Sequence, residues 1–199
     1  MPNPRSSPYL WATWLARAMS GEVACQWQFW FQVHNQLTEK VPDPFDLVGW
    51  RIDHTRMLNE LAHSLHARGF KPKLCYHFRL DLPLKATLGG EVDCLVIGDS
   101  QVSVYDCKTG HPRASDQIQV MVYMHALAQL PALRERGFTG VVVYKDQRAE
   151  IPALPATFAS NFDYFVDFLT ASDAPQKAPG ADCRFCPITA RDCSARAPS

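Results

Sequence analysis

Long apolar runs are missing from this sequence. No stretch approaches the ~18 apolar residues that a membrane-spanning helix needs, and the N-terminus has no basic segment leading into a continuous apolar stretch. An excess of charge of one sign is missing too, because 20 Lys and Arg residues balance 20 Asp and Glu residues. A strongly basic, nucleic-acid-binding surface is therefore not indicated. We expect a soluble, cytoplasmic protein in which any binding of DNA depends on a local groove.

Internal repeats and low-complexity tracts are also missing, which argues against a solenoid or a disordered chain. The 199 residues, 47% of them hydrophobic, are enough for one sizeable core. Beyond Ala171 the composition shifts to Ser, Asp, Pro, Gln, Lys and Gly, which is typical of a linker. We expect one compact unit with three parts: a helical lead-in (1–46), a core (47–171), and a linker with a cysteine-rich end (172–199).

Hydrophobic spacing predicts an α/β fold. Helical periodicity covers 8–35 with a break at Ser20–Gly21, 47–66, 115–130 with Ser115 as N-cap, and 155–170. Runs rich in Val, Ile and Tyr predict strands at 73–82, 90–98, 101–108 and 140–144, and residues 41–45 predict a loop. Strands flanked by helices in this order indicate a sheet covered by helices.

The second and third of these strands are predicted to form a hairpin around Asp99–Ser100. In that register Asp93 lies opposite Asp106, and Glu91 lies opposite Lys108. Facing carboxylates destabilise a sheet unless a cation compensates them, and apolar neighbours raise the cost further. A hard divalent ion such as Mg²⁺, held by one or two carboxylates together with water and phosphate oxygens, resolves that cost.

A structural interpretation of the same residues stays open at this point. Asp93 and Asp106 could be solvated residues on an exposed face, with Lys108 paired only to Glu91, since surface ion pairs are common and contribute only ~0–1 kcal/mol. A loop of odd length would also shift the register by one residue and place the two acids on opposite faces of the sheet.

Three elements in order resemble the RecB-like branch of the PD-(D/E)XK nucleases. They are Gly90-Glu-Val-Asp93, Val104-Tyr-Asp106-Cys-Lys108-Thr-Gly110 and Gln119-Val-Met-Val-Tyr123. An isolated Asp-x-Lys is uninformative, whereas the three elements together are distinctive. Two departures exist: Val precedes Asp93 where the pattern has Pro, and the second acid is Asp where many relatives have Glu. The resemblance implies a restriction-endonuclease-like core, a mixed central sheet flanked by helices.

The resemblance also implies a metal site. Asp93 and Asp106 would hold Mg²⁺ or Mn²⁺, with the helical His54 and the backbone carbonyl of Cys107 as further ligands. A bound ion of this kind lowers the pKa of its water and neutralises charge on a phosphate. For a single helical histidine such as His54, a structural or exposed position is the alternative.

Three further residues complete the catalytic set that the resemblance implies. Lys108 would orient the attacking water and stabilise the developing negative charge. Gln119 and Tyr123 are four residues apart and share a helix face, as a pair that touches DNA or Lys108 must. The alternative for this pair is a packed Tyr beside an ordinary surface Gln.

Seven cysteines are present, and the last three form a C-x2-C-x6-C set, Cys183, Cys186 and Cys193. Three thiolates within such a short segment favour a metal or cluster site over disulfides. Among the other cysteines, Cys94 and Cys107 occupy hairpin positions that face away from the carboxylates, where a small buried residue is the simpler account, and Cys75 lies in a predicted strand. Cys25, in the second predicted helix, is therefore the preferred fourth ligand. Zn²⁺ and an iron-sulfur cluster both accept four thiolates, so spacing alone does not separate them.

One N-terminal and three C-terminal cysteines around the core also resemble the RecB-like nucleases with an iron-sulfur cluster. The compact length is most similar to the CRISPR-associated Cas-four exonucleases. The resemblance implies that Cys25, Cys183, Cys186 and Cys193 hold a structural [4Fe-4S] cluster.

The function implied is a DNA exonuclease acting on single strands or DNA ends, in CRISPR spacer acquisition or in phage or repair DNA processing. CRISPR integrase proteins or a helicase are the implied partners. The alternatives are a non-catalytic DNA-binding or scaffolding subunit and an endonuclease of the same fold. Helical spacing favours core packing over base stacking for the five tryptophans. His111, Arg113 and Lys145 are either phosphate contacts or ordinary surface charges.

Overall fold

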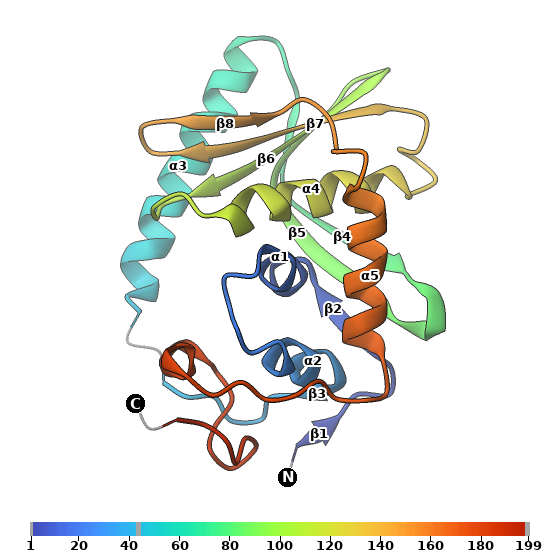
Figure 1. Ribbon diagram of the computed structural model, residues 1–199. Coiled ribbons are helices and arrows are strands. Elements are labelled where there is room, and N and C mark those ends of the chain that lie inside the picture. Colours follow the sequence, from blue (N-terminus) through green and yellow to red (C-terminus); the bar gives the residue numbers. More distant parts are fainter. Residues whose placement is uncertain (1, 43–44, 198–199) are drawn as a thin grey trace.

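A mixed six-stranded sheet forms the centre of the computed structural model, which describes residues 2–42 and 45–197 (Figure 1). Its strands are β2 (Tyr9–Trp11), β4 (Pro72–Asp81), β5 (Thr87–Ile97), β6 (Gln101–Lys108), β7 (Gly137–Tyr144) and β8 (Arg148–Ile151). The helices are α1 (Ala12–Ser20), α2 (Trp27–His34), α3 (Leu47–Ala67), α4 (Ala114–Ala128) and α5 (Phe158–Thr170). Two short strands, β1 (Asn3–Pro4) and β3 (Asn35–Gln36), pair outside this sheet, and 3-10 turns cover Pro83–Lys85 and Ala181–Phe185. The predicted α/β architecture is confirmed.

Strand β5 has two different neighbours along one edge. Its residues 87–89 pair in parallel with β2, and its residues 94–97 pair antiparallel with β6. Strand β4 pairs along the other edge. Between β2 and β6, residues 90–93 have no partner among the described strands on that edge, and β6 continues beyond β5 paired with β7. The sheet therefore forks at residues 90–93, where the predicted motif begins.

The predicted register of the β5–β6 hairpin is confirmed close to its turn. Cys94 pairs with Tyr105, Ile97 pairs with Val102, and the backbone N–H of Gly98 donates to the carbonyl of Gln101 (2.8 Å) around Asp99–Ser100. The ladder ends at Cys94, so Asp93 and Asp106 are not cross-strand partners as predicted. The predicted facing pair of Glu91 and Lys108 is also wrong, because Glu91 lies beyond the end of that ladder and its cross-strand partner is His77 of β4.

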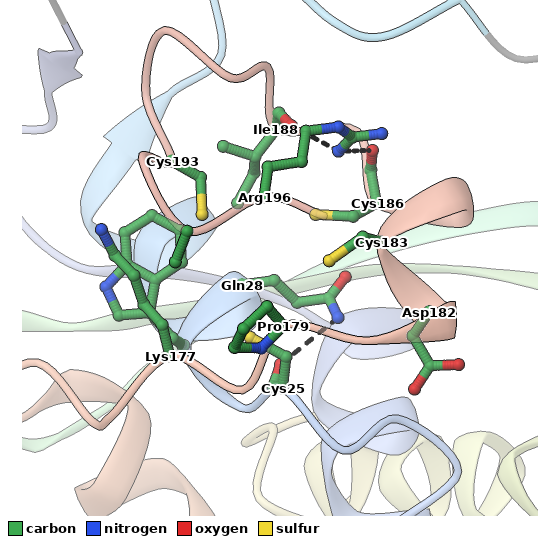
Figure 2. A pocket seen from close by; sticks show the side chains of 12 residues that line it. Cys25, Gln28, Lys177, Pro179, Asp182, Cys183, Cys186, Ile188, Cys193 and Arg196 are labelled. Carbon is green, nitrogen blue, oxygen red and sulfur yellow. Dashed lines mark hydrogen bonds between the residues drawn. The ribbon is translucent and has the colours of Figure 1, made fainter. Parts of the chain in front are cut away.

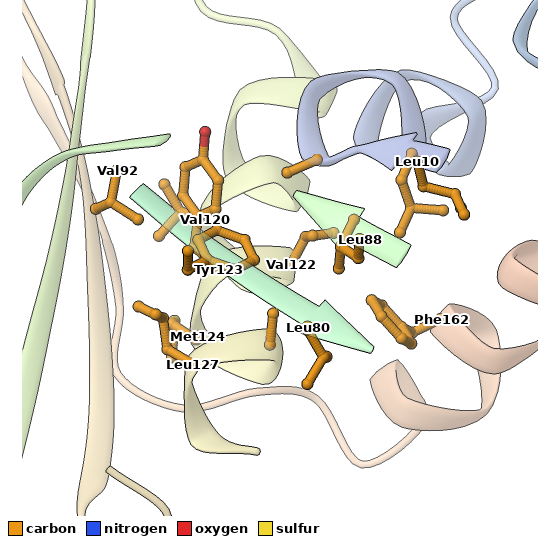
Figure 3. Packing of buried hydrophobic residues seen from close by; sticks show 14 of the residues in the cluster. Leu10, Leu80, Leu88, Val92, Val120, Val122, Tyr123, Met124, Leu127 and Phe162 are labelled. Atoms are coloured by element: carbon orange, nitrogen blue, oxygen red, sulfur yellow. The ribbon is translucent and has the colours of Figure 1, made fainter. Parts of the chain in front are cut away.

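Helices cover both faces of the sheet (Figure 1). On one face α4 lies beside α1 and α5, and side chains of α4 pack against β4 and β5 in the main core (Figure 3). These include Val120, Met124 and Leu127 of α4 with Leu80 and Leu88 of the strands. On the other face, α3 forms a smaller core with Leu58, Leu61, Leu65, Cys94, Val96, Cys107 and Val143. Cys94 and Cys107 are buried in this smaller core, as expected from their positions in the hairpin.

The N-terminal segment differs from the prediction in its first residues. Residues 9–11 form β2 and not the start of a helix, because they pair with the edge of β5 that β6 leaves free. Gly89 permits this close approach, since a Cβ atom there would collide with the hydroxyl of Tyr9. The break after α1 is confirmed: Gly21 adopts φ 70°, a left-handed conformation that glycine accepts without strain.

Smaller differences occur at other element ends. Helix α4 begins after Arg113, so Ser115 is not its cap; instead the N–H and Oγ of Ser115 donate to the Glu22 carboxylate. Helix α5 begins at Phe158, not at 155, and the short edge strand β8 was not predicted. Residues 43 and 44 of the predicted loop lie outside the described residues. No helix in the described part of the chain is long and apolar enough to span a membrane.

Candidate active site

The fork in the sheet brings Asp93 of β5 near the end of β6. In place of a ladder bond, the backbone N–H of Cys107 donates to Asp93 Oδ2 (2.7 Å). The same oxygen lies 3.1 Å from Nε2 of His54, which projects from α3. The hydrogen bond to Asp93 raises the pKa of His54, although burial opposes this. A charge-assisted contact of this kind therefore ties α3 to the fork.

Asp106 is buried on the opposite side of the fork, with 2% of its side chain exposed. Its Oδ2 lies 2.6 Å from Nζ of Lys108, whose ammonium group compensates the charge of this oxygen. Burial raises the pKa of Asp106 to about 6, against the lowering effect of Lys108. A carboxylate at this depth needs a cation beside it, and Lys108 meets that need here.

Lys108 takes its ion-pair partner from its own strand and not from Glu91. Burial disfavours its ammonium group, but the carboxylates of Asp106 and Asp93 raise the pKa of Lys108, which keeps it charged. Glu91 instead lies 3.6 Å from Nε2 of His77. The solvated Lys108–Glu91 pair considered as an alternative is therefore not formed.

Gln119 of α4 connects the acid and the lysine. Its Oε1 accepts a hydrogen bond from Lys108 Nζ (3.1 Å), and its Nε2 donates to Asp106 Oδ1 (3.2 Å) and to the Tyr123 hydroxyl (2.7 Å). Both α4 residues are buried, Gln119 at 7% and Tyr123 at 2% exposure. The two residues therefore share one helix face and touch the acid–lysine pair, while the surface-Gln alternative does not describe the structure.

These groups line one open groove of about 590 Å³. His111 and Arg113 lie along it, whereas Lys145 lines a separate hollow between α3 and the turn after β7. Asp116 also lines the groove and was not singled out from the sequence. It accepts hydrogen bonds from the Arg113 N–H (2.9 Å) and the Tyr144 hydroxyl (3.0 Å), and its place three residues after Arg113 is the available sequence signal. Trp50 of α3, for which core packing was expected, lines the groove as well.

The donor chemistry of the groove fits a hard divalent ion. Asp93 and Asp106 offer carboxylate oxygens, and His54 offers a nitrogen. Within residues 2–42 and 45–197, no three acidic, histidine or cysteine side chains converge as a ready-made metal site. An ion would therefore have to replace the His54–Asp93 and Lys108–Asp106 contacts with its own.

Four cysteines line a second, smaller cavity (Figure 2). The C-terminal segment contributes Cys183, Cys186 and Cys193 to this cavity, and the loop before α2 contributes Cys25. Cys25 was predicted to lie in the second helix, but α2 begins two residues later, at Trp27. All four are free thiols. Cys75 does not line this cavity and instead lines the groove that holds Asp93 and Asp106.

The surroundings of this cysteine cavity suit thiolate ligands. Lys177 and Arg196 line it, Trp27 and Ile188 form its apolar side, and cations nearby favour negatively charged sulfur. Backbone hydrogen bonds from Gly180 and Ala197 lower the pKa of Cys183, whereas burial raises the pKa of Cys186. The four thiols share this cavity, yet within the described residues no three of them converge closely enough to form a ready-made metal site.

The mixed sheet, its fork and the acid–lysine groove define an α/β protein with carboxylates gathered at strand ends. The model of the family described as the PD-(D/E)XK nuclease superfamily matches residues 11–191, nearly the whole chain. The chain therefore belongs to the PD-(D/E)XK nuclease superfamily. Among curated proteins, no match was found.

Solved structures with a similar fold include SSO0001, with 16% sequence identity, 92% of this chain and 84% of that chain covered, and a TM-score of 0.48. An alkaline exonuclease from Laribacter hongkongensis, LHK-Exo, has 14% identity, coverage of 81% and 87%, and a TM-score of 0.47. Its complex with dAMP has 14% identity, coverage of 80% and 87%, and the same TM-score of 0.47.

Proposed function

We propose that this protein is a metal-dependent DNA nuclease that hydrolyses phosphodiester bonds in the groove at the fork of its sheet. The observation that carries the proposal is the buried Asp106 carboxylate. It is 2% exposed, its Oδ2 lies 2.6 Å from the Lys108 ammonium, and it lines the same groove as Asp93. Burial of a carboxylate is costly without a cation, so two acids and a lysine gathered in one groove favour a site for a divalent ion and a phosphate.

The residues that would hold Mg²⁺ or Mn²⁺ are Asp93 and Asp106, with His54 and the backbone carbonyl of Cys107 completing the set. When bound, the ion supplies a water of lowered pKa and neutralises charge on the scissile phosphate. Asp93 is already positioned for this by the Cys107 N–H and by His54. The two carboxylates come from β5 and β6, whose ladder ends at Cys94, and both line the same groove.

Lys108 would orient the attacking water and stabilise negative charge on the phosphate oxygens as the water oxygen adds to phosphorus and the bond to the leaving oxygen breaks. Its charge is maintained by Asp106 and Asp93. Gln119, supported by Tyr123, fixes the direction of the Lys108 ammonium group. His111 and Arg113 are placed to contact neighbouring phosphates of the strand.

The substrate proposed is single-stranded DNA or a DNA end, and the reaction proposed is exonucleolytic. The motifs around Asp93, Asp106 and Gln119 support the RecB-like branch, and the bracketing cysteines support its iron-sulfur members, of which the Cas-four type has a similar length. CRISPR spacer acquisition, or phage or repair DNA processing, with CRISPR integrase proteins or a helicase as partners, is the corresponding biological role.

The four cysteines would hold a structural [4Fe-4S] cluster, with zinc as the alternative occupant. In this proposal residues 1–46 provide one ligand, residues 47–171 form the nuclease core, and residues 172–199 provide the linker and the other three ligands. Support comes from the four thiols that line one cavity (Figure 2), although Cys25 precedes the other three by more than 150 residues in the chain.

Cleavage of end-labelled single-stranded and duplex DNA, with Mg²⁺, Mn²⁺ or EDTA, tests the proposal. We expect metal-dependent cleavage by the wild type and a loss of at least about 10²-fold in kcat for Lys108→Ala, the effect of removing one preorganised charge. Lys145→Ala is the matched control, because Lys145 lies outside the groove, and it should retain cleavage.

Each alternative function has its own outcome in this assay. Wild-type turnover by a folded Lys108→Ala protein contradicts the catalytic assignment. Tight DNA binding by the wild type without cleavage under any metal condition points to a scaffolding subunit instead. Cleavage of circular single strands identifies an endonuclease.

A further inference from the structure

The wall of the catalytic groove at the N-terminal end of α3 is aromatic. The Trp50 ring stacks on the His54 ring, with centroids 4.9 Å apart and an interplanar angle of 27°. Phe45 lies next to it, with ring centroids 6.3 Å apart. All three side chains line the same groove as the carboxylates. One face of the indole is thus held against a residue that contacts Asp93, at the centre of the site.

Core packing does not account for this tryptophan, contrary to the expectation from helical spacing. The residues of α3 that pack against the sheet are Leu58, Leu61 and Leu65, all in its C-terminal part. Trp50 is 37% exposed, and its helical neighbours Val48 and Ile52 are 70% and 60% exposed. The first turns of α3 therefore project beyond the core, and the indole lies at the mouth of the groove and not beneath it.

An aromatic ring in this position suits an unpaired nucleobase. Every base has a π-face that stacks on tryptophan without regard to sequence, whereas the bases of a duplex already stack on one another. Because His54 separates Trp50 from Asp93 by a single ring and a 3.1 Å contact, a stacked base would belong to a nucleotide next to the scissile phosphate.

We propose that Trp50 stacks on an unpaired nucleobase adjacent to the cleaved phosphate and thereby selects single-stranded over duplex DNA at this site. The inference rests on the proposed nuclease function and specifies its substrate class. Trp50 is a specificity-determining residue in this scheme, while the metal and Lys108 provide the chemistry.

The test compares binding of a fluorescently labelled single strand with binding of a duplex of the same length, in Ca²⁺ or EDTA so that bound DNA is not consumed. One base stacked on an aromatic ring contributes about 1–3 kcal/mol, which is a loss of about five- to 150-fold in single-strand affinity for Trp50→Ala. We expect Trp50→Phe to keep most of that affinity and duplex binding to change little. Tyr164→Ala, which removes an aromatic ring that is 64% exposed on α5, is the control and should change neither.

A scan with abasic nucleotides separates stacking from an indirect effect through His54. In the wild type, an abasic site at one position of the strand should reproduce the loss seen for Trp50→Ala, and in Trp50→Ala the same abasic site should cost nothing further. The proposal is overturned if Trp50→Ala weakens binding of single strand and duplex equally. It is also overturned if removing the base and removing the indole weaken binding additively. Absence of metal-dependent cleavage by the wild type would instead contradict the proposed function, because binding is measured independently of turnover.

Discussion

At the scale of single residues, the candidate site depends on a chain of contacts that starts at Asp106. Lys108 compensates its charge, Gln119 bonds to both, and the Tyr123 hydroxyl bonds to Gln119. Each member is buried or nearly so, which makes its hydrogen bonds stronger and the loss of a partner more costly. Substitutions should therefore lower kcat less the further the residue lies from Asp106 along this chain of contacts, in the order Lys108, Gln119, Tyr123.

A graded series of variants tests this order. Gln119→Ala leaves Lys108 Nζ and Asp106 Oδ1 each without a hydrogen bond, at a cost of about 1–3 kcal/mol. We expect kcat to fall about 10- to 100-fold with little change in KM, because Gln119 is a positioning residue and does not reach the substrate. Tyr123→Phe removes only the outermost hydrogen bond and should lower kcat less than about tenfold.

The series also distinguishes positioning from mere stability. Both variants should unfold cooperatively and retain DNA affinity, since neither alters the groove surface greatly. A larger effect for Tyr123→Phe than for Gln119→Ala, or an effect on KM alone, would contradict the order of contacts. Steady-state cleavage kinetics beside thermal unfolding provide both readouts.

A second prediction at this scale concerns pH and His125 of α4. Burial against Phe158 and Phe162 lowers the pKa of His125, although Asp163 partly opposes this. A histidine with a lowered pKa in the folded state is neutral there but protonated when unfolded below about pH 6.5. It therefore contributes stability above that pH, and the contribution is lost as the pH falls through the folded-state pKa.

The variant His125→Phe keeps the aromatic contact and removes the titration. We expect its free energy of unfolding, measured with denaturant between pH 7.5 and 5, to decline less than that of the wild type as the pH falls. Parallel curves for the two proteins over this range would show that His125 does not contribute to the acid sensitivity.

At the scale of elements, the site exists because β5 changes partners along one edge. Strand β2 occupies the first part of that edge and β6 the last part, so the carboxylate of Asp93 emerges where neither strand is paired. Helix α4 then has to lie close enough to β6 and β7 for Gln119 to reach Asp106. The distance between α4 and the sheet is therefore critical for both stability and activity.

Gly140 of β7 sets that distance. A Cβ atom at this position would collide with Cγ1 of Val120 and lie 2.8 Å from Sδ of Met124, both on α4. We expect Gly140→Ala to destabilise the fold by about 1–3 kcal/mol through overpacking and to reduce cleavage by displacing Gln119. Chemical denaturation and cleavage rates measure the two effects.

Gly137, at the start of the same strand, provides the matched control. Its Cβ would lie 3.8 Å from the carbonyl oxygen of Ser100, an ordinary contact, so Gly137→Ala should change the stability by no more than about 0.5 kcal/mol. Equal effects of the two substitutions would show that the loss of glycine itself, and not the approach of α4, determines the result.

At the scale of the whole molecule, the segment after α5 returns past α2 and connects the two ends of the chain (Figure 1). The backbone N–H of Ala24 donates to Asp182 (3.3 Å), the N–H of Val41 donates to the carbonyl of Pro187 (3.0 Å), and the N–H of Ala178 donates to the thiol of Cys25 (3.5 Å). A small apolar cluster of Trp27, Phe31 and Ile188 supports this region. Under the proposed cysteine-ligand site, a bound metal or cluster would add to that stability.

Substitution of single cysteines tests that contribution. Cys25→Ser and Cys193→Ser should each lose bound iron and visible absorbance, and should lower the thermal unfolding midpoint by about 5–10 °C, the shift for a few kcal/mol in a domain of this size. Cys75→Ser, which alters a free thiol outside the cysteine cavity, should retain the iron. If the wild-type protein, purified without oxygen, is colourless and contains stoichiometric zinc, the cysteine cavity holds a zinc ion and not an iron-sulfur cluster.

The sequence by itself determined most of the elements and the order of the motifs. Period-two and helical spacing are local properties, so β4, β5, β6, α3, α4 and α5 could be predicted to within a few residues, as could the turn at Asp99–Ser100. Spacing also placed Gln119 and Tyr123 on one helix face, and burial of Cys94 and Cys107 followed from strand alternation.

Only the tertiary structure decided how these residues meet. The register arithmetic assumed an unbroken ladder and so placed Asp93 directly opposite Asp106, whereas the ladder between β5 and β6 ends at Cys94, one residue short of Asp93. The pairing of Lys108 with Asp106 and Gln119, the place of Trp50 on the groove wall and the meeting of Cys25 with the C-terminal cysteines depend on long-range packing. No local pattern encodes contacts of that kind, because they are set by which distant surfaces share a core.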